Sequence, residues 1–300
     1  MTVIIQTKNI TKKYGGTPAV SDVSFSIEQG EIIGFVGLNG AGKSTTINML
    51  LGFQKPTEGE VYIFGEKVTL PNSHKSHRRI GFATGDMSLF EGMTGRQYLT
   101  FIAKLHKTSL HTETFAALVE RFSPQLDKKL TTLSRGNKQK IALIGAFMTD
   151  PDLVILDEPS SGLDPLMQQH FLTLVREQAE KGTTIFMSSH YLNEVIDVCT
   201  RVLLIKDGKL VKDMPASQLE RTGGKLVRVI TKKEVTEPKS VEQVRRSERG
   251  EEFELEFVYK GRALRLQEWI SSQPYLQDFT VNDHSAEAAF KDLYEDGEDA

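Results

Sequence analysis

A glycine-rich segment that ends in Lys43 and Ser44 carries the clearest chemistry in the chain. It reads Gly37-Leu-Asn-Gly-Ala-Gly-Lys43-Ser44 and follows Glu31–Val36, a short apolar run that is typical of a strand. The residues after it, Ser44–Leu51, have the pattern of a helix. A glycine turn between a strand and a helix directs backbone N–H groups and the helix N-terminus toward one point, where an anion can bind. The segment therefore predicts a binding site for the phosphates of a nucleotide.

The side chains of this loop suit that ligand. Lys43 can reach the β- and γ-phosphates, and the Ser44 hydroxyl can ligate Mg²⁺. The residues of the loop and of the first helical turn that we expect to bind the nucleotide are Gly37, Asn39, Gly40, Gly42, Lys43, Ser44 and Thr45.

Two consecutive carboxylates, Asp157 and Glu158, follow the apolar run Leu153–Leu156. Such a run is typical of a strand buried on both faces of a parallel sheet, and sites in these sheets lie at the carboxyl ends of the strands. We expect Asp157 to hold Mg²⁺, directly or through water, and Glu158 to polarise the water that attacks the γ-phosphate. By itself, the pattern also fits a strand followed by a solvated acidic turn.

Three further segments follow the phosphate loop along the chain, one before the Asp157–Glu158 pair and two after it. They are Leu133-Ser-Arg-Gly-Asn137, Ser161-Gly-Leu-Asp164 and His190, which follows the apolar run Thr183–Ser189. Together, the five segments resemble the ATP-binding cassette of ABC transporters, and the resemblance covers residues from about Ile4 to Asp213.

The resemblance implies a dimer. In the family, the signature segment (Leu133–Asn137 in this chain) does not serve its own phosphate loop but closes over the ATP of a second cassette. Its expected nucleotide-binding residues are Ser134, Gly136 and Asn137, and the D-loop segment that ends at Asp164 would cross the interface. The usual family sequence is Leu-Ser-Gly-Gly-Gln. Asn137 keeps an amide at the last position, and Arg135 adds a cation near phosphate.

The resemblance also assigns single residues around the nucleotide. His190 is expected to contact the γ-phosphate and to help align Glu158 and the water, and Tyr14 matches the aromatic residue that stacks on adenine. Gly85 occupies the position at which the family usually has glutamine or glutamate. We therefore expect a weakened contact to Mg²⁺ and water there, with the adjacent Asp86 or a water molecule as a substitute.

Composition narrows the possible partners and locations. The 300 residues carry a net charge of −3, so there is no basic field that would attract nucleic acid. The N-terminal residues have no signal-type apolar region, and no apolar run approaches the roughly 18 residues of a membrane helix. A transport role thus requires a separate integral permease, and we expect the chain to lie peripherally on the cytoplasmic face of the cell membrane.

The expected fold class is α/β. We predict a phosphate-loop nucleotide-hydrolase fold with a mostly parallel sheet, an antiparallel β subdomain, a helical subdomain and a small α+β C-terminal appendage. The expected domains are a nucleotide-binding domain over 1–215, with its helical subdomain at about 87–148, and an accessory domain over 224–300. The strands expected in the antiparallel subdomain are Val3–Thr7, Val23–Ile27 and Glu60–Phe64. In the appendage we expect strands at Lys225–Lys232, Glu252–Lys260 and Leu276–Val281, and helices at Arg262–Ser272 and Ser285–Tyr294.

These observations favour a Mg²⁺-dependent ATPase subunit of an ABC transporter that works with a second cassette and a permease, with export favoured over import. One alternative is a soluble ABC-type ATPase that acts on ribosomes or nucleic acid. Such proteins usually carry two cassettes or basic insertions, and this chain has neither. Another alternative is a regulatory nucleotide-binding module with little turnover, which measured ATPase activity would distinguish.

Overall fold

The computed structural model describes residues 2–84, 92–218, 224–250 and 252–283. The chain divides into two compact units, residues 1–216 and 217–300. Within the described ranges, no helix combines the length and the apolar character needed to span a membrane.

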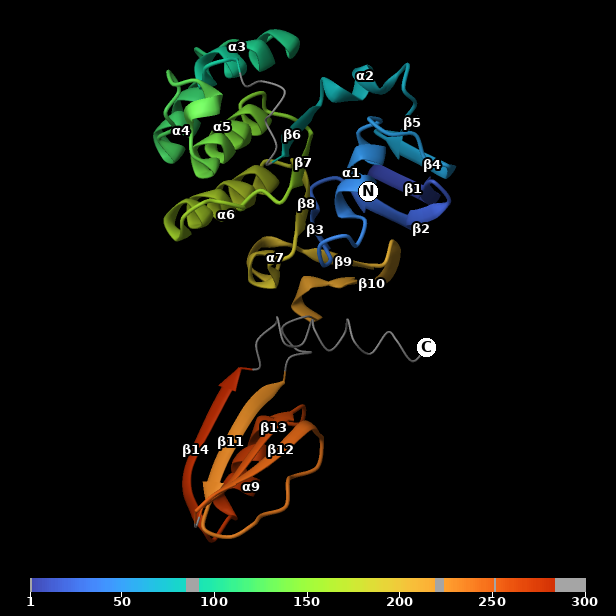
Figure 1. Cartoon of the computed structure of the whole chain (residues 1–300). Helices are drawn as coiled ribbons and strands as arrows, with labels where there is room; N and C mark the ends of the chain where they lie inside the picture. Colours follow the sequence, from blue (N-terminus) through green and yellow to red (C-terminus); the bar gives the residue numbers. More distant parts are fainter. Residues whose placement is uncertain (1, 85–91, 219–223, 251, 284–300) are drawn as a thin grey trace. The chain divides into compact units, whose positions relative to one another are not determined.

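A six-stranded sheet forms the centre of the first unit, with the strand order β10-β9-β3-β8-β7-β6 (Figure 1). Its strands are β3 (Ile32–Val36), β6 (Ile80–Thr84), β7 (Leu153–Asp157), β8 (Thr184–Ser189), β9 (Arg201–Lys206) and β10 (Lys209–Pro215). All neighbours pair in parallel except β10, which runs antiparallel to β9. Strands β3 and β8 are buried along their whole length, as expected for parallel strands that are covered on both faces.

A second, antiparallel sheet of the first unit has the order β2-β1-β4-β5. Its strands are β1 (Val3–Tyr14), β2 (Thr17–Glu28), β4 (Glu58–Ile63) and β5 (Glu66–Lys67). The predicted antiparallel subdomain is thus confirmed, although β1 and β2 continue beyond the apolar segments that predicted them. The two sheets share one apolar core, in which Phe25 of β2 stacks on Phe186 of β8 with 6.0 Å between the ring centroids.

Helices complete the first unit. They are α1 (Lys43–Leu50), α2 (Ser73–His77), α3 (Gly95–Leu105), α4 (Glu113–Phe122), α5 (Arg135–Phe147), α6 (Pro165–Glu180), α7 (Leu192–Val198) and the short 3-10 helix η2 (Leu130–Thr132). The predicted helical subdomain comprises α3, α4 and α5. Helix α5 begins directly after Ser134, whose hydroxyl accepts a hydrogen bond from the Asn137 N–H at 3.3 Å and caps the helix.

The second unit is a four-stranded antiparallel sheet with the order β12-β13-β11-β14 and one described helix. Its elements are β11 (Lys225–Thr231), β12 (Val241–Arg249), β13 (Glu252–Tyr259), α9 (Ala263–Ser271) and β14 (Leu276–Asp283). Phe257 of β13 meets Trp269 of α9 edge to face, with 5.4 Å between the ring centroids, in the core of the unit. The sequence did not predict β12, whose many charged residues hide the strand pattern. The helix predicted at Ser285–Tyr294 lies outside the described residues.

Candidate nucleotide-hydrolysing site

The order of three neighbouring strands brings the predicted catalytic segments to one edge of the parallel sheet. Strand β8 lies between β3 and β7, with Val36 opposite Ser189 and Asp157 opposite Ser188. The phosphate loop, His190 and Glu158 follow these strands directly, so they emerge side by side. This is the crevice position that open α/β sheets use for ligands.

The phosphate loop has a backbone that only glycine allows at its critical positions. Gly40 and Gly42 adopt left-handed φ values of 85° and 105°. A Cβ on Gly37 would lie 2.5 Å from the Ile205 carbonyl oxygen, and a Cβ on Gly42 would lie 2.6 Å from that of Ala19. Gly42 is also the N-cap of α1 and has no side chain to satisfy the first-turn N–H groups. The loop and the helix start therefore fit an anionic phosphate group.

The Lys43 ammonium is held at the centre of this loop. The side chain is buried, and its Nζ donates to the carbonyl oxygens of Gly37 at 2.7 Å and Leu38 at 3.2 Å. The same Nζ lies 3.4 Å from Oε1 of Glu158. The cation of the loop and the carboxylate after β7 are therefore in direct contact, and a γ-phosphate bound by Lys43 would lie within reach of Glu158.

Ser188 orients both acidic residues. Its Oγ donates to Oδ1 of Asp157 at 2.6 Å and accepts a hydrogen bond from the N–H of Glu158 at 2.9 Å. Glu158 has a φ of 50°, a left-handed conformation that is strained for a residue with a side chain. Such strain persists where surrounding contacts impose it, and here it sets the direction of the carboxylate. We did not identify Ser188 from the sequence, because its role depends on β8 lying beside β7.

His190 lies on the other side of the Glu158 carboxylate. Its Nδ1 is 3.2 Å from Oε2 of Glu158, but the two atoms do not form a hydrogen bond. This nitrogen is buried and has no hydrogen-bond partner among the described residues. A buried polar atom without a partner beside the Glu158 carboxylate can bind a further polar group. Glu158 thus lies between the Lys43 ammonium and the His190 imidazole.

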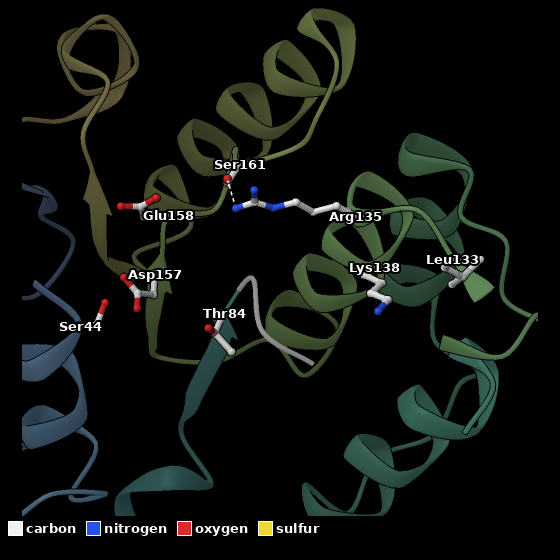
Figure 2. Close-up of a pocket in the computed structure, with 8 residues that line it drawn as sticks. All are labelled: Ser44, Thr84, Leu133, Arg135, Lys138, Asp157, Glu158 and Ser161. Carbon is white, nitrogen blue, oxygen red and sulfur yellow. Dashed lines mark hydrogen bonds between the residues drawn. The ribbon is translucent and has the colours of Figure 1, made fainter. Parts of the chain in front are cut away.

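A pocket of about 480 Å³ opens in front of these groups (Figure 2). It is lined by Ser44, Thr84, Leu133, Arg135, Lys138, Asp157, Glu158 and Ser161. Ser44, Asp157 and Glu158 lie on one side, and Lys138 of α5 lies across from them. The described residues contain no group of three or more metal-ligating side chains. Two oxygen ligands, such as Ser44 and Asp157, nonetheless suit Mg²⁺, which takes its other ligands from water and phosphate.

The loop that follows Glu158 is anchored from two helices. Gln139 Nε2 of α5 donates to the Pro159 carbonyl at 2.8 Å, and Ser160 Oγ donates to Oε2 of Glu194 of α7 at 2.7 Å. Glu194 is buried, and burial raises the pKa of its carboxyl above the ordinary value. We did not identify Gln139 or Glu194 from the sequence, where each resembles any polar residue of an amphipathic helix.

Other residues predicted for the nucleotide site lie around its margin. Tyr14 ends β1, is 47% exposed and donates its hydroxyl to Oε1 of Gln54, and the Lys12 ammonium lies 5.4 Å from the centre of its ring. Asn39 is exposed in the phosphate loop, and Thr45 is half-buried in the first turn of α1.

Two of the residues predicted at the dimer interface, Asp164 and Asn137, form hydrogen bonds within their own chain. The Asp164 carboxylate caps α6 by accepting from the Met167 N–H at 3.0 Å. The Asn137 amide donates to Ser134 Oγ at 3.3 Å, which fixes the start of α5. Gly85 and Asp86, the predicted contact to Mg²⁺ and water, lie outside the described residues.

Comparison with known proteins agrees with this geometry. The family model described as ABC transporter matches residues 20–161. The chain is 37% identical to the bacitracin transport ATP-binding protein BcrA of Bacillus licheniformis over 229 residues, which cover 75% of this chain and 74% of the relative. It is 34% identical to the SkfA peptide export ATP-binding protein SkfE of Bacillus subtilis, covering 72% of this chain and 91% of the relative.

Solved structures show the same fold over most of the chain. An ATP-binding subunit of an ABC transporter matches 73% of this chain and 92% of its own length, with a TM-score of 0.66 and 29% identity. The dimeric post-hydrolysis state of the cassette MJ0796, bound to ADP and Pi, matches 71% of this chain and 99% of its own, with a TM-score of 0.65 and 25% identity. The chain therefore belongs to the ATP-binding proteins of ABC transporters, and it is an ATP-hydrolysing cassette of that family.

Proposed function

We propose that the chain supplies energy to a separate membrane permease by Mg²⁺-dependent ATP hydrolysis, and that the transporter works as an exporter. The observation that carries the catalytic part is the position of Glu158, 3.4 Å from Lys43 Nζ and 3.2 Å from His190 Nδ1. In this arrangement Lys43 binds the β- and γ-phosphates, Glu158 accepts a proton from the attacking water, and His190 orients both.

Ser44 and Asp157 are the residues that would hold Mg²⁺. Both present oxygen atoms to the same pocket, and the bond from Ser188 fixes the Asp157 carboxylate. When bound, the ion neutralises charge on the phosphates. The remaining nucleotide contacts in the proposal come from the backbone of the phosphate loop, with Tyr14 against the adenine.

A second cassette completes the site in this proposal. Ser134 and Gly136 stand at the N-terminus of α5, where backbone N–H groups and the helix dipole favour an anion. Together with Asn137 they would close over the nucleotide of the partner, beside Asp164. The dimeric relative bound to ADP and Pi supports this arrangement.

The names of related proteins support export. They describe bacitracin transport, SkfA peptide export and linearmycin resistance. By analogy, we propose an integral permease as partner and a peripheral position on the cytoplasmic face of the membrane, where ATP and Mg²⁺ are available. Residues 1–215 would form the nucleotide-binding domain, and residues 224–300 an accessory domain.

Two measurements test the proposal. Affinity purification of the tagged chain from membranes should recover an integral protein, and the recovered complex should release phosphate from ATP only with Mg²⁺ present. Recovery without any integral protein, together with binding to ribosomes or nucleic acid, would support the soluble alternative. Tight ATP binding with negligible turnover in the intact complex would support the regulatory alternative.

A further inference from the structure

Arg135 is a charged residue at a position where the family usually has glycine. The proposed nucleotide contacts of the signature segment are made by Ser134, Gly136 and Asn137, and its extra cation has no specific contact assigned to it. In the structure, the guanidinium extends from α5 to the loop that follows Glu158, as Figure 2 shows, and Nη2 donates to Ser161 Oγ at 2.5 Å.

The backbones of the two segments also fit closely together. A Cβ on Gly136 would lie 2.5 Å from the carbonyl oxygen of Gly162. Gly162 has a left-handed φ of 84°, and a Cβ there would lie 3.0 Å from Cγ of Arg135. The aliphatic part of Arg135 therefore covers the Gly162 backbone, while its guanidinium bonds to the preceding residue.

Helix stability does not explain an arginine at this place. Arg135 is the first residue of α5, where the helix dipole disfavours a cation. Its hydrogen-bond partner is a neutral hydroxyl, which compensates less than a carboxylate would. The contact that the arginine makes is with the loop, where it holds Ser161 in place.

Helix α5 thus holds the loop that follows Glu158 through two hydrogen bonds, one buried and one exposed. Gln139 is buried, and its bond to the Pro159 carbonyl fixes the root of the loop beside Glu158. Arg135 is exposed, and its bond to Ser161 fixes the outer part. An exposed bond can break and re-form without disturbing the core.

We propose that Arg135 is a positioning residue for ATP hydrolysis. Its bond to Ser161 holds the signature segment and the D-loop segment of one chain together. The two segments then form one preordered surface to which the second cassette binds. The inference rests on the proposed dimeric ATPase. A surface ordered before docking loses less conformational freedom on association. Without the bond, ATP-dependent pairing weakens, whereas ATP affinity of the free chain does not change.

The test is ATPase turnover of the purified full-length chain across a series of protein concentrations, at saturating ATP and Mg²⁺. The variants are Arg135→Met, Ser161→Ala and the double variant, and methionine keeps the aliphatic cover over Gly162. Lys140→Met is the matched control, because it removes the same charge from the same helix away from the pocket lining. ATP affinity is measured at low protein concentration for every variant.

We expect each single variant to raise the protein concentration for half-maximal turnover by roughly two- to tenfold, as suits one exposed charge-assisted bond. The double variant should raise this concentration no more than the single variant with the larger effect does, because both changes remove the same bond. Lys140→Met should require the same concentration as the parent.

Three outcomes would overturn the inference: parental behaviour of Arg135→Met and Ser161→Ala, effects that multiply in the double variant, or a parent turnover that does not depend on protein concentration. If Arg135→Met fails to fold, Ser161→Ala alone still tests the bond. A parent chain that neither binds nor hydrolyses ATP would instead refute the proposed function.

Discussion

Replacement of Glu158 by glutamine separates ATP binding from hydrolysis. Glutamine has nearly the same shape, so the left-handed backbone at φ 50° and the N–H bond to Ser188 can both remain. The change removes the carboxylate that accepts a proton from water, and a positioned general base contributes about 10²–10⁴-fold to turnover. We expect a loss of turnover of that size.

The same change should affect folding and ATP affinity only slightly. Lys43 loses a charged neighbour at 3.4 Å but keeps the carbonyls of Gly37 and Leu38, so we expect a stability loss of about 1 kcal/mol. Removal of one negative charge beside the γ-phosphate should favour ATP slightly. We propose that hydrolysis reopens the ATP-bound dimer, so in this variant ATP binding persists while the dimer stays closed.

Phosphate release, equilibrium ATP binding and thermal unfolding measure these effects separately. Size-exclusion chromatography with ATP and Mg²⁺ should show a dimer for Glu158→Gln and mostly monomer for the parent, if the chain pairs with itself. Glu180→Gln, an exposed residue at the end of α6, is the matched control and should behave as the parent. Hydrolysis within tenfold of the parental rate would refute the assignment of Glu158 as the base.

The remaining predictions concern other parts of the molecule. Lys43→Ala should weaken ATP binding by about ten- to a hundredfold, as expected for a lost bond to a charged group, and an affinity within a few-fold of the parent in equilibrium titration would remove the loop assignment. Burial raises the pKa of Glu194 above its ordinary value of 4.5. Below pH 4.5 the carboxyl is protonated in both the folded and the unfolded chain and does not affect stability. As pH rises from there through the raised pKa, the unfolded chain ionises more readily, so the folded protein loses stability. Glu194→Gln cannot ionise, and its melting temperature relative to the parent should therefore increase from about pH 4 to pH 7; a constant difference would contradict this reasoning. A chain that ends at residue 216 should fold and bind ATP with parental affinity, because the compact unit that carries the phosphate loop ends there, and a folded fragment that cannot bind ATP would refute the separation.

The sequence by itself determined the local elements and the family. The glycine turn before Lys43, the carboxylates after an apolar run, and the order of the five segments sufficed to predict an α/β cassette, and the comparisons confirm that family. These signals are local, because turn geometry, helix starts and buried strands depend on residues close together in the chain. A strand such as β12 was missed, since its charged side chains obscure the periodicity on which such predictions depend.

Only the tertiary structure decided which distant side chains meet. The insertion of β8 between β3 and β7 placed His190 and Ser188 beside Glu158, and no local pattern specifies the order of parallel strands. The anchoring of the loop by Arg135 and Glu194 likewise depends on the packing of α5 and α7 against the sheet edge. Both bonds join residues more than twenty positions apart in the chain, so no local pattern could predict them. The bond between Ser160 and Glu194 is buried, where polar groups have few other partners, whereas that of Arg135 is exposed. The sequence therefore predicted the candidate reacting groups, and the packing of strands and helices determined how their side chains are oriented.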